Sequence, residues 1–214
     1  MKIGILGSGD VGRALGHGFA REGHDVKIGT RDAKSGKLDE WKAQAGARGS
    51  VGTLDETAAF GEIVVIALPW SGVKNGLDLA GLAHFANKVV IDATNPLVFT
   101  EGAPPGLALG HTDSGGEQIQ RWLPDANVVK AFNIVGNGLF YKPQLAGGPP
   151  TMFIAGNDAE AKRTVTGILT SFGWETIDSG GIEGARTLEP LCILWVGTAL
   201  GSGNWHQAFK MLRG

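Results

Sequence analysis

The chain has 214 residues, of which 43% are hydrophobic and 19% charged, and this size and composition fit one globular domain, or one domain with a small addition. They exclude an intrinsically disordered chain. With 19 Lys and Arg against 21 Asp and Glu, the net charge of −2 provides no basic surface, so we expect neither nucleic acid nor a membrane as a partner.

The N-terminal half alternates short apolar runs with segments of helical periodicity. Residues 2–6 predict a strand, 11–22 a helix and 25–29 a second strand, which together form a βαβ unit. A charged surface helix is predicted over residues 33–47. Residues 62–68 are apolar on both faces, which is typical of a central strand in a parallel sheet covered by helices on both sides.

Two further parallel strands are predicted at 88–92 and 127–132, with a helix at 116–122 before the second. A cluster of Pro and Gly then marks a boundary after residue 142. We therefore predict an α/β fold with a doubly wound, Rossmann-type parallel sheet in residues 1–142. Residues 143–214 are predicted to form a small C-terminal extension, for substrate binding or dimerisation, packed on the same core.

The predicted extension begins with a strand at 151–155 and a helix at 158–172, for which Asn157 is the expected N-cap. A short strand at 174–178 follows. The last helix, over 184–201, is so apolar that it must be buried in the core or against a second subunit. We expect it to form a homodimer.

Residues 7–12 read Gly-Ser-Gly-Asp-Val-Gly, which fits the G-x-G-x-x-G pattern between a strand and a helix. Gly7 permits a tight turn, Gly9 lets backbone amides approach a pyrophosphate, and Gly12 lets the helix pack on the strand. The free amides and the helix dipole would then face the phosphates. Asp10 fits best as a helix-start acid turned toward solvent.

The end of the second predicted strand decides which dinucleotide binds, because a carboxylate there binds a free ribose 2′-hydroxyl and a guanidinium binds a 2′-phosphate. Thr30 and Arg31 stand at this point, and they predict NADP(H). The alternative is that Asp32 is the ribose-binding acid. Further donors follow at Lys34, Ser35 and Lys37.

The order of motifs along nearly the whole chain resembles that of the NADPH-dependent reductases of the deazaflavin coenzyme F420. It is also similar to the cytosolic reductase domain of the STEAP metalloreductases. The motifs that carry the resemblance are the glycine turn with Thr30-Arg31, Asn95-Pro96-Leu97, residues 129–133, residues 153–159, residues 178–180 and the segment 185–189.

The resemblance implies contacts with NADP(H) along the carboxyl ends of the strands. They are Gly7, Ser8, Gly9, Asp10, Val11 and Gly12 at the pyrophosphate turn, Thr30, Arg31, Lys34 and Ser35 toward the 2′-phosphate, Leu68, Pro69 and Trp70 over the ribose side, and Asn95, Pro96, Ala131 and Asn133 around the nicotinamide. Trp70 could equally be a packing residue, and Asn95 and Asn133 could be turn residues bonded to their own backbone.

The implied reaction is hydride transfer between NADPH and coenzyme F420 or a flavin, in which catalysis is positioning and no side chain is predicted to act as acid or base. Three alternatives stay open: reduction of FMN, FAD or riboflavin, reduction of a small imine or carbonyl compound, and NADPH sensing without catalysis. The five histidines are scattered, and we predict no metal site. His206 is expected on the surface and Cys192 in the packing. Without a signal-like or membrane-spanning segment, we expect a soluble, cytoplasmic protein.

Overall fold

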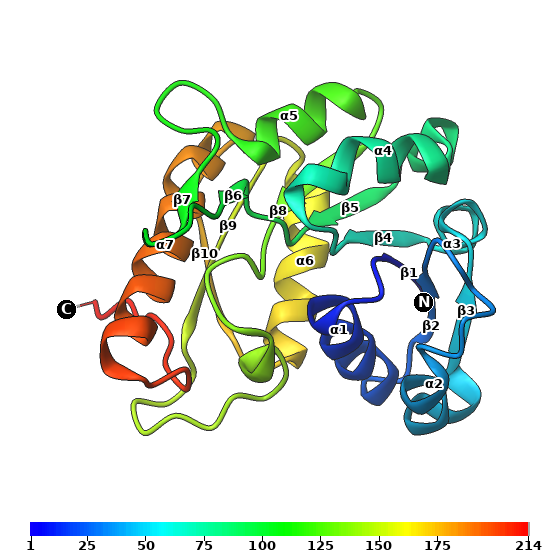
Figure 1. Cartoon of the computed structure of the whole chain (residues 1–214), viewed down its shortest axis with the longest axis horizontal. Helices are drawn as coiled ribbons and strands as arrows, with labels where there is room; N and C mark the ends of the chain where they lie inside the picture. Colours follow the sequence, from blue (N-terminus) through cyan, green and yellow to red (C-terminus); the bar gives the residue numbers. More distant parts are fainter. Residues whose placement is uncertain (214) are drawn as a thin grey trace.

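A computed structural model describes residues 1–213 and shows an α/β fold built on one eight-stranded sheet (Figure 1). The strands of this sheet are β1 (Lys2–Leu6), β2 (Asp25–Gly29), β3 (Gly49–Gly52), β4 (Ile63–Ile66), β5 (Val89–Asp92), β8 (Asn127–Lys130), β9 (Thr151–Gly156) and β10 (Glu175–Asp178). Their order across the sheet is β10-β9-β8-β5-β4-β1-β2-β3. A separate hairpin pairs β6 (Leu97–Val98) with β7 (Gly106–Leu107).

Helices cover both faces of the sheet. They are α1 (Asp10–Arg21), α2 (Asp39–Ala45), α3 (Leu54–Phe60), α4 (Trp70–Ala80), α5 (Gly115–Trp122), α6 (Ala159–Ser171) and α7 (Ala185–Ser202). Short 3-10 turns are η1 (Gly46–Arg48), η2 (Leu82–Phe85), η3 (Asn137–Leu139) and η4 (Ile182–Gly184).

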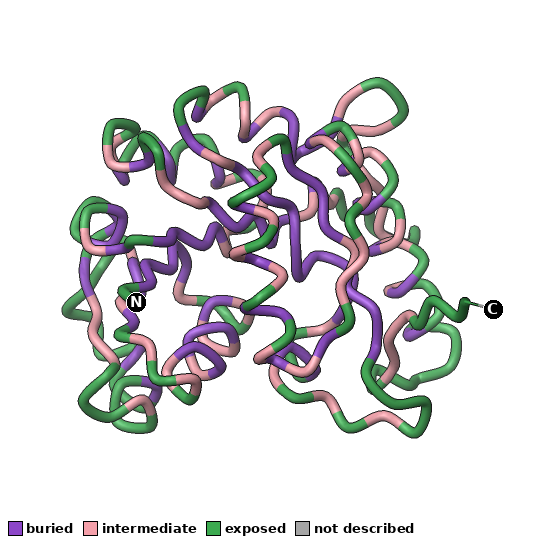
Figure 2. The backbone as a smooth tube through the Cα atoms, turned by 180° about the vertical axis from the view of Figure 1, so that it is seen from behind, coloured by how far each residue is buried: buried purple, intermediate pink, exposed green. Residues whose placement is uncertain are grey.

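The alternation of side chains along each strand divides the core into two layers. Ile63 and Val65 of β4 join the layer under α1, α2 and α6, whereas Val64 and Ile66 join the layer under α3, α4 and α5. All four are buried, as both-face burial of a central parallel strand requires. Figure 2 shows the buried backbone running through these central strands.

The predicted doubly wound, Rossmann-type α/β fold is confirmed, with one difference in strand direction. Neighbouring strands from β3 to β8 are parallel, and β9 is parallel to β10, but β9 runs antiparallel to β8. The sheet is therefore mostly, and not entirely, parallel. β9, α6, β10 and α7 all come from residues 143–214, and β9 joins them to the sheet through β8.

Several predicted boundaries were wrong for local reasons. The helix expected over 33–47 is reduced to α2, because Gly36 adopts φ +72° and the segment before it turns at Asp32. The strand expected over 127–132 ends at Lys130, because Phe132 adopts φ +63°. The N-cap of α6 is Asp158 and not Asn157: the Asp158 carboxylate accepts from Ala161 N at 2.7 Å, while Asn157 Oδ1 accepts from Ile182 N.

The elements β3, α3 and α4 were not predicted. The N-terminus of α3 carries a capping box, in which the Thr53 and Glu56 side chains each accept from the other's backbone amide. These elements complete the first half of the sheet and place the start of α4 beside the carboxyl ends of β1 and β4.

Candidate functional site

A cleft of about 860 Å³ opens at the carboxyl ends of β1, β2 and β4. In parallel α/β sheets this edge is where ligands bind. The residues that line the cleft come from four segments: Gly7, Ser8 and Gly9; Gly29, Thr30, Arg31, Asp32, Ser35 and Lys37; Leu54, Ala67, Leu68 and Pro69; and Ser71, Gly72, Asn75, Gly76 and Leu79.

The glycine turn has the geometry that a pyrophosphate needs. Gly7 adopts φ +128°, and a Cβ there would collide with the carbonyl of Ala67. A Cβ at Gly12 would collide with the carbonyl of Gly7, whereas at Gly9 it would meet no atom within 4 Å and would project into open space. Gly9 is also the N-cap of α1 and offers no side chain to its first amides, so these amides are left for a ligand.

The other residues of this turn differ in where their side chains lie. Ser8 lines the cleft, and its hydroxyl lies 3.4 Å from the Thr30 hydroxyl. Asp10 is exposed and pairs with Arg13 one turn along α1, as expected for a helix-start acid. Val11 is half-buried against the core, and Gly12 is buried. Val11 and Gly12 thus shape the turn from beneath.

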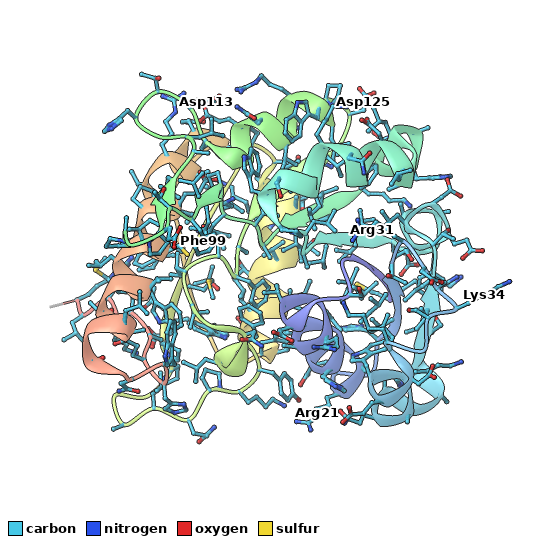
Figure 3. All side chains as sticks on the ribbon, viewed as in Figure 1. Arg21, Arg31, Lys34, Phe99, Asp113 and Asp125 are labelled. Carbon is cyan, nitrogen blue, oxygen red and sulfur yellow. The ribbon has the colours of Figure 1, made fainter. Side chains whose placement is uncertain are left out.

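The cationic end of the cleft is formed by Arg31 and Lys37, with the Thr30 and Ser35 hydroxyls beside them. Within residues 1–213, Arg31 takes part in no hydrogen bond or ion pair that would divert its guanidinium. Lys34 is exposed and lies outside the cleft lining. Figure 3 shows Lys34 at the outer margin of the molecule and Arg31 further inward. The lysine that lines this cleft is therefore Lys37 and not Lys34, and Lys37 was not among the predicted cofactor contacts.

Asp32 also lines the cleft, but its carboxylate is engaged locally. Its Oδ1 accepts from the Lys34 amide at 3.0 Å, and its carbonyl accepts from the Ser35 hydroxyl at 2.9 Å. This turn directs the chain so that Ser35 and Lys37 return to the cleft.

Leu68 and Pro69 line the cleft, whereas Trp70 does not. Trp70 begins α4, and its ring stacks on Trp122 with the centroids 5.7 Å apart and the planes at 22°. This is the packing alternative for Trp70. The lining residues of α4 were missed because α4 itself was missed, although Val73, Leu77 and Ala80 follow Pro69 at helical spacing and gave the signal.

Asn95 and Asn133 form a pair across the carboxyl ends of β5 and β8. Asn95 Nδ2 donates to the Asn133 carbonyl at 2.8 Å, and Asn133 Nδ2 donates to Asn95 Oδ1 at 3.0 Å and to the Leu188 carbonyl at 3.0 Å. They are therefore not turn residues bonded to their own backbone. Pro96, which follows Asn95, and Ala131, two residues before Asn133, are both buried. These four residues lie outside the lining of the 860 Å³ cleft, on the next strands along the same edge.

One atom of this pair has no partner. Asn133 is 2% exposed, and its Oδ1 accepts no hydrogen bond from residues 1–213. Phe132, just before it, has a left-handed backbone (φ +63°), which is a rare conformation for a bulky residue. Phe132 is held there by edge contacts with Phe140 and by packing on Phe172. Strained backbone of this kind clusters at functional sites.

A buried ionic network lies beside the pair and was not predicted. Lys130 is fully buried, and its ammonium bonds Asp92 Oδ2, the Thr94 carbonyl and Glu189 Oε1, each at 2.8 Å. Burial by itself lowers the pKa of Lys130, but Asp92 and Glu189 outweigh burial and raise this pKa above its ordinary value. The signal was a charged residue at the end of each of two apolar strands, β5 and β8.

Two other titratable groups lie outside the cleft, Cys192 in the packing and His206 on the surface. Burial raises the pKa of the Cys192 thiol to about 11, so this thiol stays protonated. His206 is exposed, with its ring nitrogen 3.1 Å from the Gln144 carbonyl.

The part of the chain that the structure describes contains no cluster of His, Cys, Asp or Glu arranged for a metal ion. None of its helices is long and apolar enough to cross a membrane.

A glycine turn at the first βα connection, free helix amides and a guanidinium at the end of the second strand define a Rossmann-type dinucleotide-binding protein. The family described as "NADP oxidoreductase coenzyme F420-dependent" matches residues 2–96. The solved structure of a candidate F420-dependent NADP reductase from Arthrobacter sp. FB24 is 37% identical over 100% of both chains, with a TM-score of 0.93. The chain belongs to this family of NADP-dependent oxidoreductases, as its motifs predicted.

Two curated relatives extend the comparison. The F420-dependent NADP reductase of Methanothermobacter thermautotrophicus is 28% identical over 213 residues, which cover 92% of this chain and 88% of the relative. The metalloreductase STEAP3 of Rattus norvegicus is 29% identical over 191 residues, covering 89% of this chain. The match spans only 36% of that metalloreductase. A reductive aminase from Aspergillus terreus, 19% identical with a TM-score of 0.67, shares the fold.

Proposed function

We propose that the protein binds NADP(H) and transfers hydride between its nicotinamide and coenzyme F420. The observation that carries the dinucleotide part is the meeting of the glycine turn with Arg31 and Lys37 in one cleft. The choice of F420 rests on the relatives, above all the 37% identity to a candidate F420-dependent NADP reductase over the whole chain.

On this proposal, each group of site residues binds a different part of the dinucleotide. The backbone amides of the glycine turn and of the first turn of α1 bind the pyrophosphate, and Arg31 and Lys37 bind the 2′-phosphate, with Thr30 and Ser35 donating from their hydroxyls. Leu68 and Pro69 cover the ribose side. Asn95, Pro96, Ala131 and Asn133 frame the nicotinamide, where the orphaned Asn133 Oδ1 fits a ligand with an N–H group.

Catalysis on this proposal is positioning. The nicotinamide supplies a hydride, and the protein holds the two ring systems face to face, with their reacting carbons about 3–3.5 Å apart. Of the nearby charged groups, Lys130 and Glu189 are buried in an ion pair and Asp10 is paired at the surface. No proton transfer by a side chain is needed for this step.

A homodimer is proposed as well. α7 is buried on one side through Leu188, Cys192 and Trp195, but its other side exposes Leu194 and Leu200. Leu194 and Leu200 flank the exposed side of α7, and we propose that a second copy of the chain covers this side. Light scattering of the purified protein tests this: twice the chain mass is expected, and substitution of both leucines by Glu should give a monomer.

The function is tested by offering NADPH and a panel of acceptors to the purified protein and following nicotinamide absorbance. F420, FMN, FAD, riboflavin and a cyclic imine are the acceptors. Turnover with F420 is the expected result. Turnover with flavins alone would move the assignment to a flavin reductase, and turnover with the imine alone would move it to an imine reductase. Tight binding of NADPH without turnover of any acceptor would contradict the enzyme assignment and leave a sensor.

A further inference from the structure

The buried network around Lys130 uses every proton of its ammonium group. Lys130 Nζ has three partners at 2.8 Å: Asp92 Oδ2, the Thr94 carbonyl and Glu189 Oε1. The partners are themselves satisfied. Asp92 Oδ1 accepts from the amide and the hydroxyl of Thr94 at 2.9 and 2.7 Å. Each ammonium proton therefore has its own acceptor, and these bonds fix the orientation of the group.

Glu189 extends this network to a second helix. Its two carboxylate oxygens accept from the amides of Gly115 and Gly116, each at 3.0 Å, at the first turn of α5. A carboxylate is favoured there by the free amides and by the helix dipole. Through Glu189, the ammonium of Lys130 ties α7 and α5 to the carboxyl ends of β5 and β8.

The same three segments that form the network also form the Asn95–Asn133 pair. The end of β5 and the residues that follow it give Asp92 and Thr94 to the network and Asn95 to the pair. The end of β8 and the residues that follow it give Lys130 to the network and Asn133 to the pair. α7 gives Glu189 to the network and the Leu188 carbonyl to the pair. The network and the amide pair are therefore anchored to the same three segments.

The pair leaves one hydrogen-bonding direction open. Both protons of Asn133 Nδ2 are used, by Asn95 Oδ1 and the Leu188 carbonyl, so the orientation of the amide is set and Oδ1 faces away from them. Oδ1 is buried and has no donor within the described residues. An orphaned buried acceptor is costly unless a ligand supplies the donor. A ligand that satisfies this oxygen must present a hydrogen-bond donor, and the N–H of a carboxamide is such a donor.

We propose that Lys130 is a positioning residue, which holds Asn133 so that its Oδ1 accepts an N–H of the nicotinamide carboxamide. This deepens the proposed function and rests on it. An apolar side chain of similar length would avoid the cost of burying an ion, but it could not fix the directions of three separate segments. The ion network is retained for that geometry.

The test separates the two ends of the dinucleotide by calorimetric titration with three ligands. 2′,5′-ADP reports the phosphate end alone, NADP⁺ reports the whole site, and the 3-acetylpyridine analogue of NADP⁺ replaces the carboxamide NH₂ with a methyl group. Wild type should bind NADP⁺ about tenfold tighter than the analogue. Asn133→Ala and Lys130→Met should each reduce that ratio to about one and leave the affinity for 2′,5′-ADP unchanged.

Three further variants serve as controls for this test. Lys130→Met leaves two buried carboxylates, so Lys130→Met/Glu189→Gln, which keeps the net charge of the network, is measured beside it. The double variant Lys130→Met/Asn133→Ala should lose no more than either single variant, because Lys130 acts through Asn133. The matched control is Lys88→Met at the other end of β5, where the ammonium bonds the Ala58 carbonyl at 2.8 Å. Lys88→Met should keep the tenfold ratio.

The outcomes distinguish the two proposals. Failure of wild type to bind 2′,5′-ADP or NADP⁺ would overturn the proposed function, and this inference with it. Normal binding of 2′,5′-ADP, with equal affinities of wild type for NADP⁺ and the analogue, would overturn only the role of Asn133 and Lys130. A loss of 2′,5′-ADP affinity in step with NADP⁺ in the Lys130 variants would show a general structural role and overturn it too.

Discussion

A Cβ added to Gly12 would lie only 2.0 Å from the carbonyl oxygen of Gly7, so that no side chain fits between α1 and the turn after β1 at this point. We expect Gly12→Ala to lower the free energy of unfolding by roughly 1–3 kcal/mol, since an added methyl must push backbone against backbone. Thermal or urea unfolding of the protein without ligand measures this.

Gly9→Ala, three residues earlier in the same turn, is the matched variant. A Cβ there meets no atom within 4 Å. The free energy of unfolding should therefore stay within about 0.5 kcal/mol of wild type, while the affinity for NADP⁺ falls, because the methyl group occupies the approach to the pyrophosphate. Unchanged NADP⁺ affinity in a stable Gly9→Ala protein would place the pyrophosphate elsewhere.

Arg31→Ala should abolish most of the preference for NADPH over NADH. A charge-assisted, bidentate contact with the 2′-phosphate is worth roughly tenfold to a hundredfold in affinity. The measurement is the ratio of dissociation constants for the two dinucleotides. Lys37→Ala should lower this ratio less, since an ammonium makes a point contact. Lys34→Ala is the control and should leave it unchanged, because Lys34 lies off the cleft.

The pair of Glu117 and Arg186 ties α5 to α7 and should give the protein a specific acid sensitivity. The Arg186 guanidinium lowers the pKa of Glu117 below its ordinary value of 4.5, and the Glu117 side chain is only 11% exposed. A carboxyl with a lowered pKa contributes stability that is complete above pH 4.5 and is lost as the pH falls through the lowered pKa.

Urea unfolding at a series of pH values tests this contribution. Glu117→Gln should make the protein less stable than wild type at pH 7, with a difference that shrinks as the pH falls below 4.5. Glu160→Gln is the control, because Glu160 pairs with Arg163 on the surface with 78% and 66% of the side chains exposed. An equal response of both variants would contradict the assignment.

Cys192 should be almost inert to thiol reagents in the native protein. With its pKa at about 11, about one thiol in a thousand is ionised at pH 8, and the side chain is buried in α7. Labelling with an aromatic disulfide reagent should be slow in buffer and fast in denaturant. Fast labelling of the folded chain would show that this part of α7 opens readily.

Part of the first half of the fold could be read from local patterns, whereas the missed elements carried weaker signals. β1, α1 and β2 have clear periodicity and a glycine turn between them. β3 reads Gly-Ser-Val-Gly and α4 contains Gly72 and Gly76, so neither shows the propensity of the element it forms. The reversed direction of β9 also left no mark, since an apolar strand reads alike in either direction.

In the candidate site, too, residues close together in the sequence could be predicted, and residues brought together only by the fold could not. The glycine turn and Arg31 are neighbours along the chain in one βαβ unit, so their spacing predicted a shared role. Lys130 and Glu189 come from elements 59 residues apart in the printed numbering, and their contact depends on how α7 docks. Lys37 was recognised as a cation but not as a cleft residue, because the turn at Asp32 that brings it back depends on local hydrogen bonds.

Because β9 runs antiparallel to β8, the carboxyl end of β9 lies at the edge of the sheet where β8 begins, opposite the edge proposed to bind the nucleotide. The turn after β9, with Asn157 and Asp158, opens beside Asn127 where β8 begins. Asp125, exposed in the turn just before β8, stands on that same edge and is labelled in Figure 3. A fluorophore or a surface linker attached at Asp125 would sit a full strand length from the nucleotide, so the protein could be tethered there with its binding edge facing the solution.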